Sequence, residues 1–290
     1  MEAKKVGFIG LGNMGMPMAR NLLKKAGSLV AFNRSQEKTM EIMKEGAEAA
    51  ENAADVAKKA DIIFLSLPGP AQVDEVVRVL IENGKEGQII VDLSTVSPKL
   101  NREMSALGQT KGIQYIDVPV SGGPAGAANG TLSLMIGASE EEFTSLGLKE
   151  YTDTFGDKYF YMGGRGNGNA IKIINNYMAF AAQVINGEAL AMADTLGISQ
   201  EAFYEVTTKS SGNNMILGAK KQKILSGDYK PGFALDLVVK DLELARQLCQ
   251  DEEIPNFTLN TALQFYRIAQ AKGYGKEDSS AVIRTIRELH

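Results

Sequence analysis

The segment "GNGNAIKIINN", residues 166–176, holds the side chains best placed for acid–base chemistry. Lys172 and Asn176 are four residues apart, so a helix would place both on one face. The small residues just before them, Gly166 and Gly168, allow a ligand to come close to the backbone. A lysine in a partly desolvated pocket could donate a proton to a carbonyl oxygen, or remove one from an alcohol. Asn176 could orient either that oxygen or the lysine.

Other acid–base groups are excluded by what the chain lacks. Its single histidine, His290, is the C-terminal residue, so no internal histidine can act as acid or base. With only one cysteine as well, Cys249, a zinc site of the usual ligands is implausible, and we expect no metal. None of the nine tyrosines is followed by a lysine four residues later, so the Tyr-x-x-x-Lys pair of short-chain reductases is missing. Lysine remains.

A glycine-rich loop near the N-terminus predicts a dinucleotide cofactor. Gly10-Leu11-Gly12-Asn13-Met14-Gly15 follows an apolar strand pattern and opens a helical one. In such loops the first glycine makes the turn, the second admits the pyrophosphate and the third lets helix and strand pack. The helix N-terminus then offers free N–H groups to the phosphates.

The end of the second predicted strand, Asn33-Arg34-Ser35, bears on which cofactor binds. NAD enzymes usually place an acid here to bind the ribose hydroxyls, whereas an arginine suits the 2′-phosphate of NADP. No acid is present, and the Arg34 guanidinium could grip a phosphate with two hydrogen bonds. We therefore predict that NADP is preferred and that NAD is possible. The alternative is a solvated surface arginine.

Further candidate residues follow other predicted strands. Ser121-Gly122-Gly123 comes after "IDVPV", and two successive glycines can expose backbone N–H groups to an anion. Thr95 ends "IIVDLST", and Leu67 and Pro68 end "DIIFLSLP". Ligands of open parallel sheets bind beyond the carboxyl ends of strands, so Thr95 is expected near the nicotinamide and the substrate, with Leu67 and Pro68 flanking the cofactor. The alternative for Thr95 is an ordinary threonine at a strand end.

The elements that position these residues form two domains. Up to about residue 165, short Val/Ile/Leu/Phe runs alternate with helical patterns, which is typical of a parallel sheet in an α/β fold. After Gly168 the pattern is helical throughout. We predict a Rossmann-type cofactor domain at 1–165, a helical substrate and dimerisation domain at 166–290, and a long linking helix at about 169–194.

The composition limits the partners. The chain has 290 residues, of which 44% are hydrophobic and 23% charged, with a formal charge of −4. No basic block suggests nucleic acid, and no apolar run reaches the roughly 18 residues of a membrane span. The N-terminus runs directly into a strand pattern, without a signal-peptide cleavage site. One cysteine suits a reducing compartment, so we expect a cytoplasmic protein.

These motifs, in this order and across essentially the whole chain, resemble the β-hydroxyacid dehydrogenases. That family includes 3-hydroxyisobutyrate and 2-(hydroxymethyl)glutarate dehydrogenases and the tartronate, glyoxylate and succinic semialdehyde reductases. "GFIGLGNMGMPMARNLL" resembles its cofactor motif, and "DVPVSGGPAGAANGTLSLMIGA" its substrate signature. "GNGNAIKIINN" resembles its catalytic motif, and "GFALDLVVKDLELA" a later segment that closes over the ligands.

The resemblance implies a set of roles. Ser121, Gly122 and Gly123 would hold the substrate carboxylate, Lys172 would be the acid–base residue and Asn176 its helper. Phe233 and Asp241 would contact the substrate and Lys240 the cofactor, as this later segment closes over nicotinamide and substrate. The substrate would be a small carboxylate-bearing aldehyde or hydroxy acid lying in a cleft. Family members associate through the helical domain, which implies a homodimer or homotetramer.

Two rival functions and the substrate stay open. A decarboxylating enzyme like 6-phosphogluconate dehydrogenase would have His-Asn after the lysine, where this chain has Asn175-Asn176, and a glutamate in place of Ala179. A non-catalytic NADP-binding module would tend to have lost Lys172. "TKSSGNNM", residues 208–215, favours the hydroxyisobutyrate and hydroxymethylglutarate enzymes, whereas Asn33-Arg34-Ser35 favours the NADPH-using reductases. Asn213 and Asn214 could read a distal substrate group or cap the next helix.

Overall fold

The computed structural model describes residues 4–289, and its chain forms two compact units, Met1–Lys172 and Ile173–His290. The division falls inside a long helix. The sequence pattern instead places the boundary before this helix, between residues 165 and 166.

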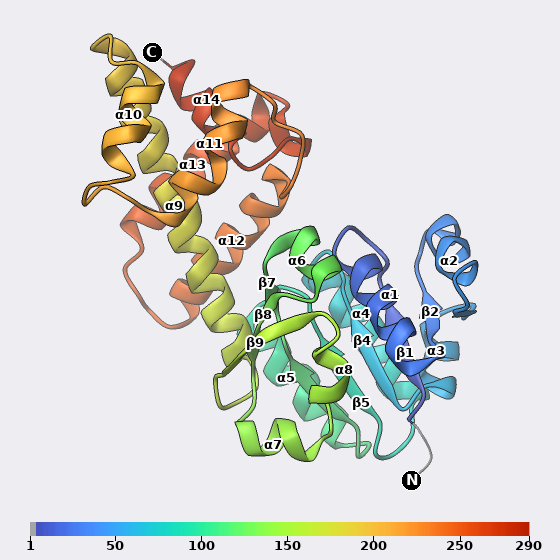
Figure 1. Cartoon of the computed structure of the whole chain (residues 1–290). Helices are drawn as coiled ribbons and strands as arrows, with labels where there is room; N and C mark the ends of the chain where they lie inside the picture. The colour runs from blue at the N-terminus through green and yellow to red at the C-terminus, as the bar shows by residue number, and fades with distance from the viewer. Residues whose placement is uncertain (1–3, 290) are drawn as a thin grey trace. The chain divides into compact units, whose positions relative to one another are not determined.

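The first unit is built on a six-stranded parallel sheet with the strand order β3-β2-β1-β4-β5-β6 (Figure 1). The order reverses direction at β1, which is the arrangement of a Rossmann-type dinucleotide-binding fold. The predicted α/β fold class is therefore confirmed. The strands are β1 (Val6–Ile9), β2 (Val30–Phe32), β3 (Glu48–Ala49), β4 (Ile62–Leu65), β5 (Ile89–Asp92) and β6 (Gln114–Asp117).

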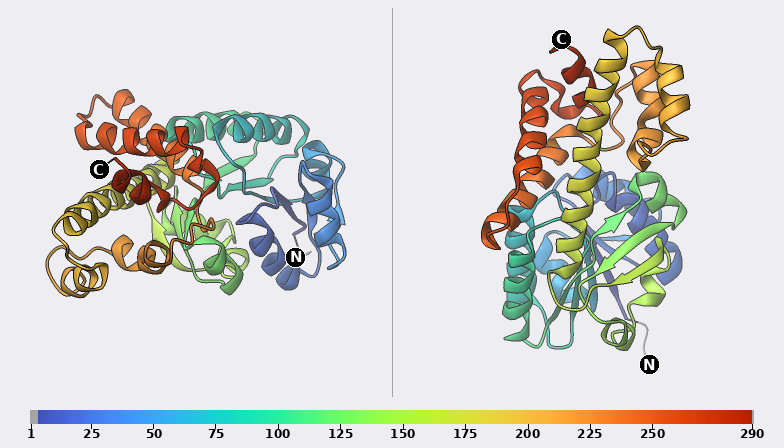
Figure 2. Two further views of the ribbon diagram at one scale, coloured as in Figure 1. Left: turned by 90° about the horizontal axis from the view of Figure 1, so that it is seen from above. Right: turned by 90° about the vertical axis from the view of Figure 1, so that its left-hand side faces the viewer.

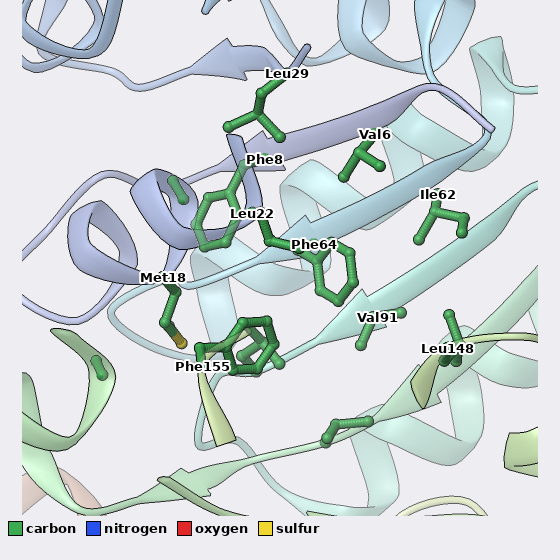
Figure 3. Packing of buried hydrophobic residues seen from close by; sticks show 14 of the residues in the cluster. Val6, Phe8, Met18, Leu22, Leu29, Ile62, Phe64, Val91, Leu148 and Phe155 are labelled. Carbon is green, nitrogen blue, oxygen red and sulfur yellow. The ribbon is translucent and has the colours of Figure 1, made fainter. Parts of the chain in front are cut away.

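Both faces of this sheet are buried at its centre, where every residue of β1, β4 and β5 is buried and most are apolar. Along β4, for example, Ile62 and Phe64 point into one hydrophobic cluster and Ile63 and Leu65 into the other. Figure 3 shows the first cluster, where the ring of Phe64 packs against the edge of Phe155, with 5.9 Å between centroids. The helices between these strands are α1 (Gly15–Ala26), α2 (Gln36–Met43), α3 (Ala53–Lys59), α4 (Pro70–Asn83) and α5 (Pro98–Gln109).

A second, three-stranded sheet completes the first unit, and the sequence pattern does not predict it. The run "IQYIDVPVSGG" reads as one strand but divides into β6 and β7 around Val118 and Pro119, because proline has no N–H for the ladder. β7 then pairs antiparallel with β8, which pairs parallel with β9. These elements are β7 (Val120–Ser121), α6 (Gly123–Asn129), β8 (Leu132–Ile136), α7 (Glu140–Ser145), α8 (Lys149–Thr152) and β9 (Gly156–Tyr161).

The second unit is helical. Its helices surround a core that includes Leu235, Leu242 and Tyr266. The long helix α9 runs unbroken from Asn167 to Thr195 (Figure 2), close to the predicted 169–194. No helix among residues 4–289 is long and apolar enough to cross a membrane. The remaining elements are α10 (Gln200–Thr207), α11 (Met215–Ser226), α12 (Leu235–Asp251), α13 (Phe257–Ala271), the 3-10 turn η1 (Tyr274–Lys276) and α14 (Ala281–Arg287).

Candidate active site

The candidate residues of the first unit gather at one edge of its parallel sheet. Asn33 follows β2, Gly10 follows β1, Leu67 follows β4, Thr95 follows β5, and Ser121 follows β6 in β7. Parallel strands carry their carboxyl ends to the same edge, and these strands are successive neighbours in the sheet. Residues from five separate motifs are thereby brought to one side of the unit.

The three glycines of the loop after β1 differ in whether the fold requires a glycine at their position. Gly10 has φ of 98°, a left-handed conformation, and a Cβ there would overlap the Ser66 carbonyl oxygen. A Cβ on Gly15 would overlap the Gly10 carbonyl oxygen. Gly12, however, has nothing within 4 Å of the position of a Cβ, so the fold itself does not require a glycine there. Open space at Gly12 fits the approach of a pyrophosphate.

The start of α1 and the end of β2 frame this loop. Met14, at the N-cap of α1, makes no side-chain capping bond, so the first N–H groups of the helix are not taken by a cap. The Asn33 side chain accepts a hydrogen bond from Leu11 N–H at 2.9 Å and donates one to the Ser35 carbonyl at 3.1 Å. Asn33 therefore holds the loop in place, while Asn13, Arg34 and Ser35 are exposed.

The loop after β6 has the backbone shape expected of an anion site. Ser121 is half-buried, and Gly122 and Gly123 both have positive φ, 135° and 67°. A Cβ on Gly122 would lie 2.9 Å from the Leu132 side chain, whereas Gly123 faces open space. Successive backbone N–H groups in such a turn can converge on a carboxylate.

The start of α9 is joined to this sheet edge by two buried side chains that sequence reasoning missed. The Asp117 carboxylate, at the end of β6, accepts hydrogen bonds from Gly166 N–H at 2.8 Å and Asn169 N–H at 2.9 Å. Asn169 in turn accepts from Val96 N–H at 2.9 Å, beside Thr95. Burial raises the pKa of Asp117, although these N–H groups oppose the rise. The first turn of α9 is thereby held against the ends of β5 and β6.

A second buried carboxylate lies on the neighbouring strand. Asp92 accepts from Ser94 N–H at 2.9 Å and from the Tyr115 hydroxyl at 2.8 Å, and that hydroxyl accepts from Asn101. Burial raises the pKa of Asp92 to about 6, since these hydrogen bonds only partly offset the lost hydration. One sequence signal could have revealed both Asp92 and Asp117. Each is a carboxylate at the end of a strand whose preceding residues are mostly apolar.

The predicted catalytic pair lies in buried positions on α9. Lys172 is 8% exposed and Asn176 7% exposed, and one helical turn separates them on the same face. A lysine is seldom buried to this degree unless it is paired. Their burial is what the proton-transfer interpretation of this segment requires.

In the second unit, Asn176 meets two other predicted residues. Its amide nitrogen donates to Asp241 Oδ2 at 2.7 Å, and Lys240 Nζ lies 2.9 Å from Asp241 Oδ1. Asp241 is only 2% exposed. One turn further along α9, Phe180 stacks on Phe233, with ring centroids 5.7 Å apart. The sequence-predicted residues Asn176, Phe233, Lys240 and Asp241 thus line the same part of this unit.

The segment that carries Phe233 is fixed by a buried ion pair. Asp278 accepts from Gly232 N–H at 3.0 Å and Phe233 N–H at 3.3 Å, from Ser280, and from Lys220 Nζ at 2.8 Å. Burial would raise the pKa of Asp278, but Lys220 and Ser280 outweigh it and bring the pKa to about 2. Sequence reasoning named neither Lys220 nor Asp278.

The two asparagines just before α11, Asn213 and Asn214, have different surroundings. Asn214 caps that helix by accepting from Leu217 N–H at 2.9 Å, and its amide also pairs reciprocally with Asn186. Its hydrogen-bonding groups are therefore engaged within the second unit. Asn213 is exposed.

Comparison with known sequences assigns both halves of the chain. The profile for the NAD binding domain of 6-phosphogluconate dehydrogenase matches residues 5–163. A second profile, described as the NAD-binding region of NADP-dependent 3-hydroxyisobutyrate dehydrogenase, matches residues 166–286.

Similar proteins align over nearly the full length. A 2-(hydroxymethyl)glutarate dehydrogenase of Eubacterium barkeri is 39% identical, covering 98% of this chain and 95% of its own. The mitochondrial 3-hydroxyisobutyrate dehydrogenase of Rattus norvegicus is 33% identical, covering 98% and 87%. The solved structure of a 3-hydroxyisobutyrate dehydrogenase of Mycobacterium tuberculosis with L-serine is 29% identical. It has a TM-score of 0.89 and covers 98% of this chain and 99% of its own.

Proposed function

This chain belongs to the β-hydroxyacid dehydrogenase family, and we propose that it interconverts a small 3-hydroxy acid and its aldehyde with NADP as the preferred cofactor. That it is an NAD(P)-dependent dehydrogenase follows from its family membership. The observation that carries the catalytic part of the proposal is the buried face of α9 with Lys172 and Asn176.

The proposed chemistry divides between cofactor and protein. When bound, the nicotinamide supplies a hydride to the carbonyl carbon during reduction, or accepts it during oxidation. Lys172, as an ammonium, gives a proton to the carbonyl oxygen, so that the carbonyl π bond is replaced by a C–H and an O–H bond. The neutral lysine regains a proton from water. In the oxidation direction neutral Lys172 removes the hydroxyl proton.

The cofactor loop and the loop after β6 supply binding. The start of α1, which no side chain caps, and the open side of Gly12 suit the pyrophosphate, with Leu67, Pro68 and Thr95 flanking the rest of the cofactor. The substrate carboxylate would lie on Ser121, Gly122 and Gly123.

The preference for NADP rests on the end of β2. Asn33 stands where an acid would bind the ribose hydroxyls, and its side chain is engaged by Leu11 and Ser35. Arg34 and Ser35 are exposed beside it, and the Ser35 hydroxyl makes no capping hydrogen bond to α2. Both side chains suit a 2′-phosphate. Arg34→Ala should raise the KM for NADPH at least tenfold and leave that for NADH within about twofold. Lys38→Ala, an exposed cation on α2 that pairs with Glu41, is the control. Equal effects on both cofactors would refute the preference.

The names of the relatives favour 3-hydroxy acids as substrates. 2-(Hydroxymethyl)glutarate and 3-hydroxyisobutyrate each carry a hydroxymethyl group on the carbon next to a carboxylate. A site with a carboxylate loop and one acid–base lysine matches both groups. We therefore propose this substrate class, with semialdehydes as the reverse substrates.

The test is hydride transfer followed by cofactor absorbance. Wild type and Lys172→Ala are assayed with NADPH and NADH against glyoxylate and the tartronate, methylmalonate and succinate semialdehydes, and with NADP⁺ against 3-hydroxyisobutyrate and 2-(hydroxymethyl)glutarate. We expect turnover of at least one compound and a loss of at least 10²-fold in kcat for the variant. Cofactor binding without turnover would instead favour a non-catalytic module.

We also propose that the chain forms a homodimer or homotetramer in the cytoplasm. Met178, Ile185 and Met192 recur every seven residues on α9 and are 66%, 58% and 65% exposed. Such a stripe of apolar side chains on a helix is typical of an association surface. Light scattering of Met178→Lys/Met192→Lys should show a smaller species than wild type. An unchanged mass would remove the support that this stripe gives.

A further inference from the structure

The orientation of the Asn176 side-chain amide can be assigned from its neighbour. An amide presents a donor at one end and an acceptor at the other, whereas a carboxylate oxygen only accepts. Because Asp241 Oδ2 lies 2.7 Å away, the NH₂ end of Asn176 must face Asp241. Its carbonyl oxygen Oδ1 therefore points away from Asp241. The reverse orientation would place two acceptors against each other in a buried position.

Both oxygens of Asp241 have a partner within the second unit, Oδ2 through a hydrogen bond and Oδ1 through an ion pair without hydrogen-bond geometry. Oδ2 accepts from Asn176, and Oδ1 lies 2.9 Å from Lys240 Nζ. Lys240 balances the charge of a carboxylate that is only 2% exposed. Little of Asp241 is left to contact a substrate directly.

We propose that Asp241 is a positioning residue that acts through Asn176, and that Asn176 serves the acid–base site as a hydrogen-bond acceptor. This inference rests on the proposed function of Lys172. One N–H of Asn176 is held by Asp241, and this orientation turns Oδ1, which has a long contact of 3.4 Å from Asn175 Nδ2, away from Asp241. Oδ1 can accept a hydrogen bond from the ammonium of Lys172, four residues earlier on the same helical face, or from a substrate hydroxyl.

The proposal separates two roles for the asparagine. As a donor, Asn176 would polarise the carbonyl of the substrate. As an acceptor, it holds the lysine or the alcohol ready for proton transfer. The bond to Asp241 turns Oδ1 away from that carboxylate and so favours the second role, and Asp241 then affects catalysis only while Asn176 is present.

A double-mutant cycle tests this dependence. Asn176→Ala, Asp241→Leu and the double variant are assayed on the substrate that wild type turns over best. We expect each single variant to lower kcat by about 10- to 100-fold, as is typical when a supporting hydrogen bond is lost, with KM changed by less than about threefold. The double variant should be no slower than the slower single variant. Multiplying losses, or a KM at least tenfold higher in Asp241→Leu alone, would overturn the proposal in favour of a direct substrate contact.

Controls keep the outcome interpretable. Glu243→Gln, on the same helix α12 and paired with Arg246 and Arg267, should leave kcat and KM unchanged. If Asp241→Leu does not fold, as judged by its melting temperature and NADPH affinity, Asp241→Asn takes its place in the cycle. The same non-additivity is then expected. Lys172→Ala is assayed in parallel. An active Lys172→Ala would defeat the proposed function, whereas an inactive one with a multiplicative cycle would defeat only the role of Asp241.

Discussion

Asp92 in the first unit and Asp278 in the second are both completely buried, yet their pKa values are shifted in opposite directions. The pKa of Asp92 is raised to about 6, and that of Asp278 is lowered to about 2, from the usual 3.8. Asp92 has hydrogen bonds from Ser94 and Tyr115 but no ion-pair partner among the described residues, and the nearby Asp117 raises its pKa further. Asp278 has Lys220.

The difference teaches that burial alone does not decide whether an acidic side chain is charged. Desolvation is the largest influence at both sites and raises both pKa values. At Asp278 a cation and several N–H and O–H donors together exceed it. At Asp92 the hydrogen bonds are too weak to outweigh desolvation, so the pKa stays raised. The two sites should therefore respond differently to substitution and to pH.

Removing the cation should have the largest effect. Lys220→Met leaves the buried Asp278 carboxylate without its partner, and we expect unfolding free energy to fall by about 3 to 5 kcal/mol at pH 7. Calorimetric unfolding of wild type and of Lys220→Met at pH 7 would measure this loss. Lys209→Met, which removes an exposed lysine paired with Glu205, should change stability by less than about 1 kcal/mol. A similar small loss for Lys220→Met would mean that the pair is not what stabilises Asp278.

The raised pKa of Asp92 should appear as a pH dependence. The folded protein holds this proton up to about pH 6 and the unfolded chain only to about 3.8. Stability from this group is therefore present below pH 4 and is lost as pH rises to 6, by about 3 kcal/mol in all. Asp92→Asn cannot titrate, so its stability relative to wild type should rise by that amount between pH 4 and 7. A difference that stays constant with pH would contradict the assignment.

Asp278 should behave with the opposite sign. Its folded pKa lies below the usual value, so its stabilisation is complete above about pH 4 and is lost as pH falls through 2. The loss amounts to about 2 kcal/mol. In urea unfolding at pH 2 to 5, Asp278→Asn should therefore not show this loss of stability at acid pH. If the variant loses as much stability at acid pH as wild type, the loss comes from other carboxylates.

The smallest effect concerns the hydroxyl that supports Asp92. Tyr115→Phe removes one hydrogen bond to the carboxylate and leaves Asn101 without its acceptor. We expect a loss of about 1 to 2 kcal/mol at pH 7 and less at pH 4, where Asp92 is protonated. Chemical denaturation at the two pH values measures both. A loss that is larger at pH 4 would show that the hydroxyl does not support the charged form.

The sequence alone determined the fold class and the order of the motifs, because both depend on local patterns. The glycine loop at 10–15, the apolar strands and the helix at 169–194 are signals of neighbouring residues, and each corresponds to an observed element. Lys172 and Asn176 could be paired in advance because a helix places residues four apart on one face.

Only the tertiary structure decided which distant side chains meet. Asn176 and Asp241 are 65 residues apart, and Asp117 reaches the start of α9 across 49 residues. Neither spacing follows from a helical or strand period. The second sheet was likewise missed, since pairing of β7 with β8 depends on the path of the chain after Pro119. The opposite pKa shifts of Asp92 and Asp278 have the same origin, because they depend on which side chains the fold brings to each carboxylate.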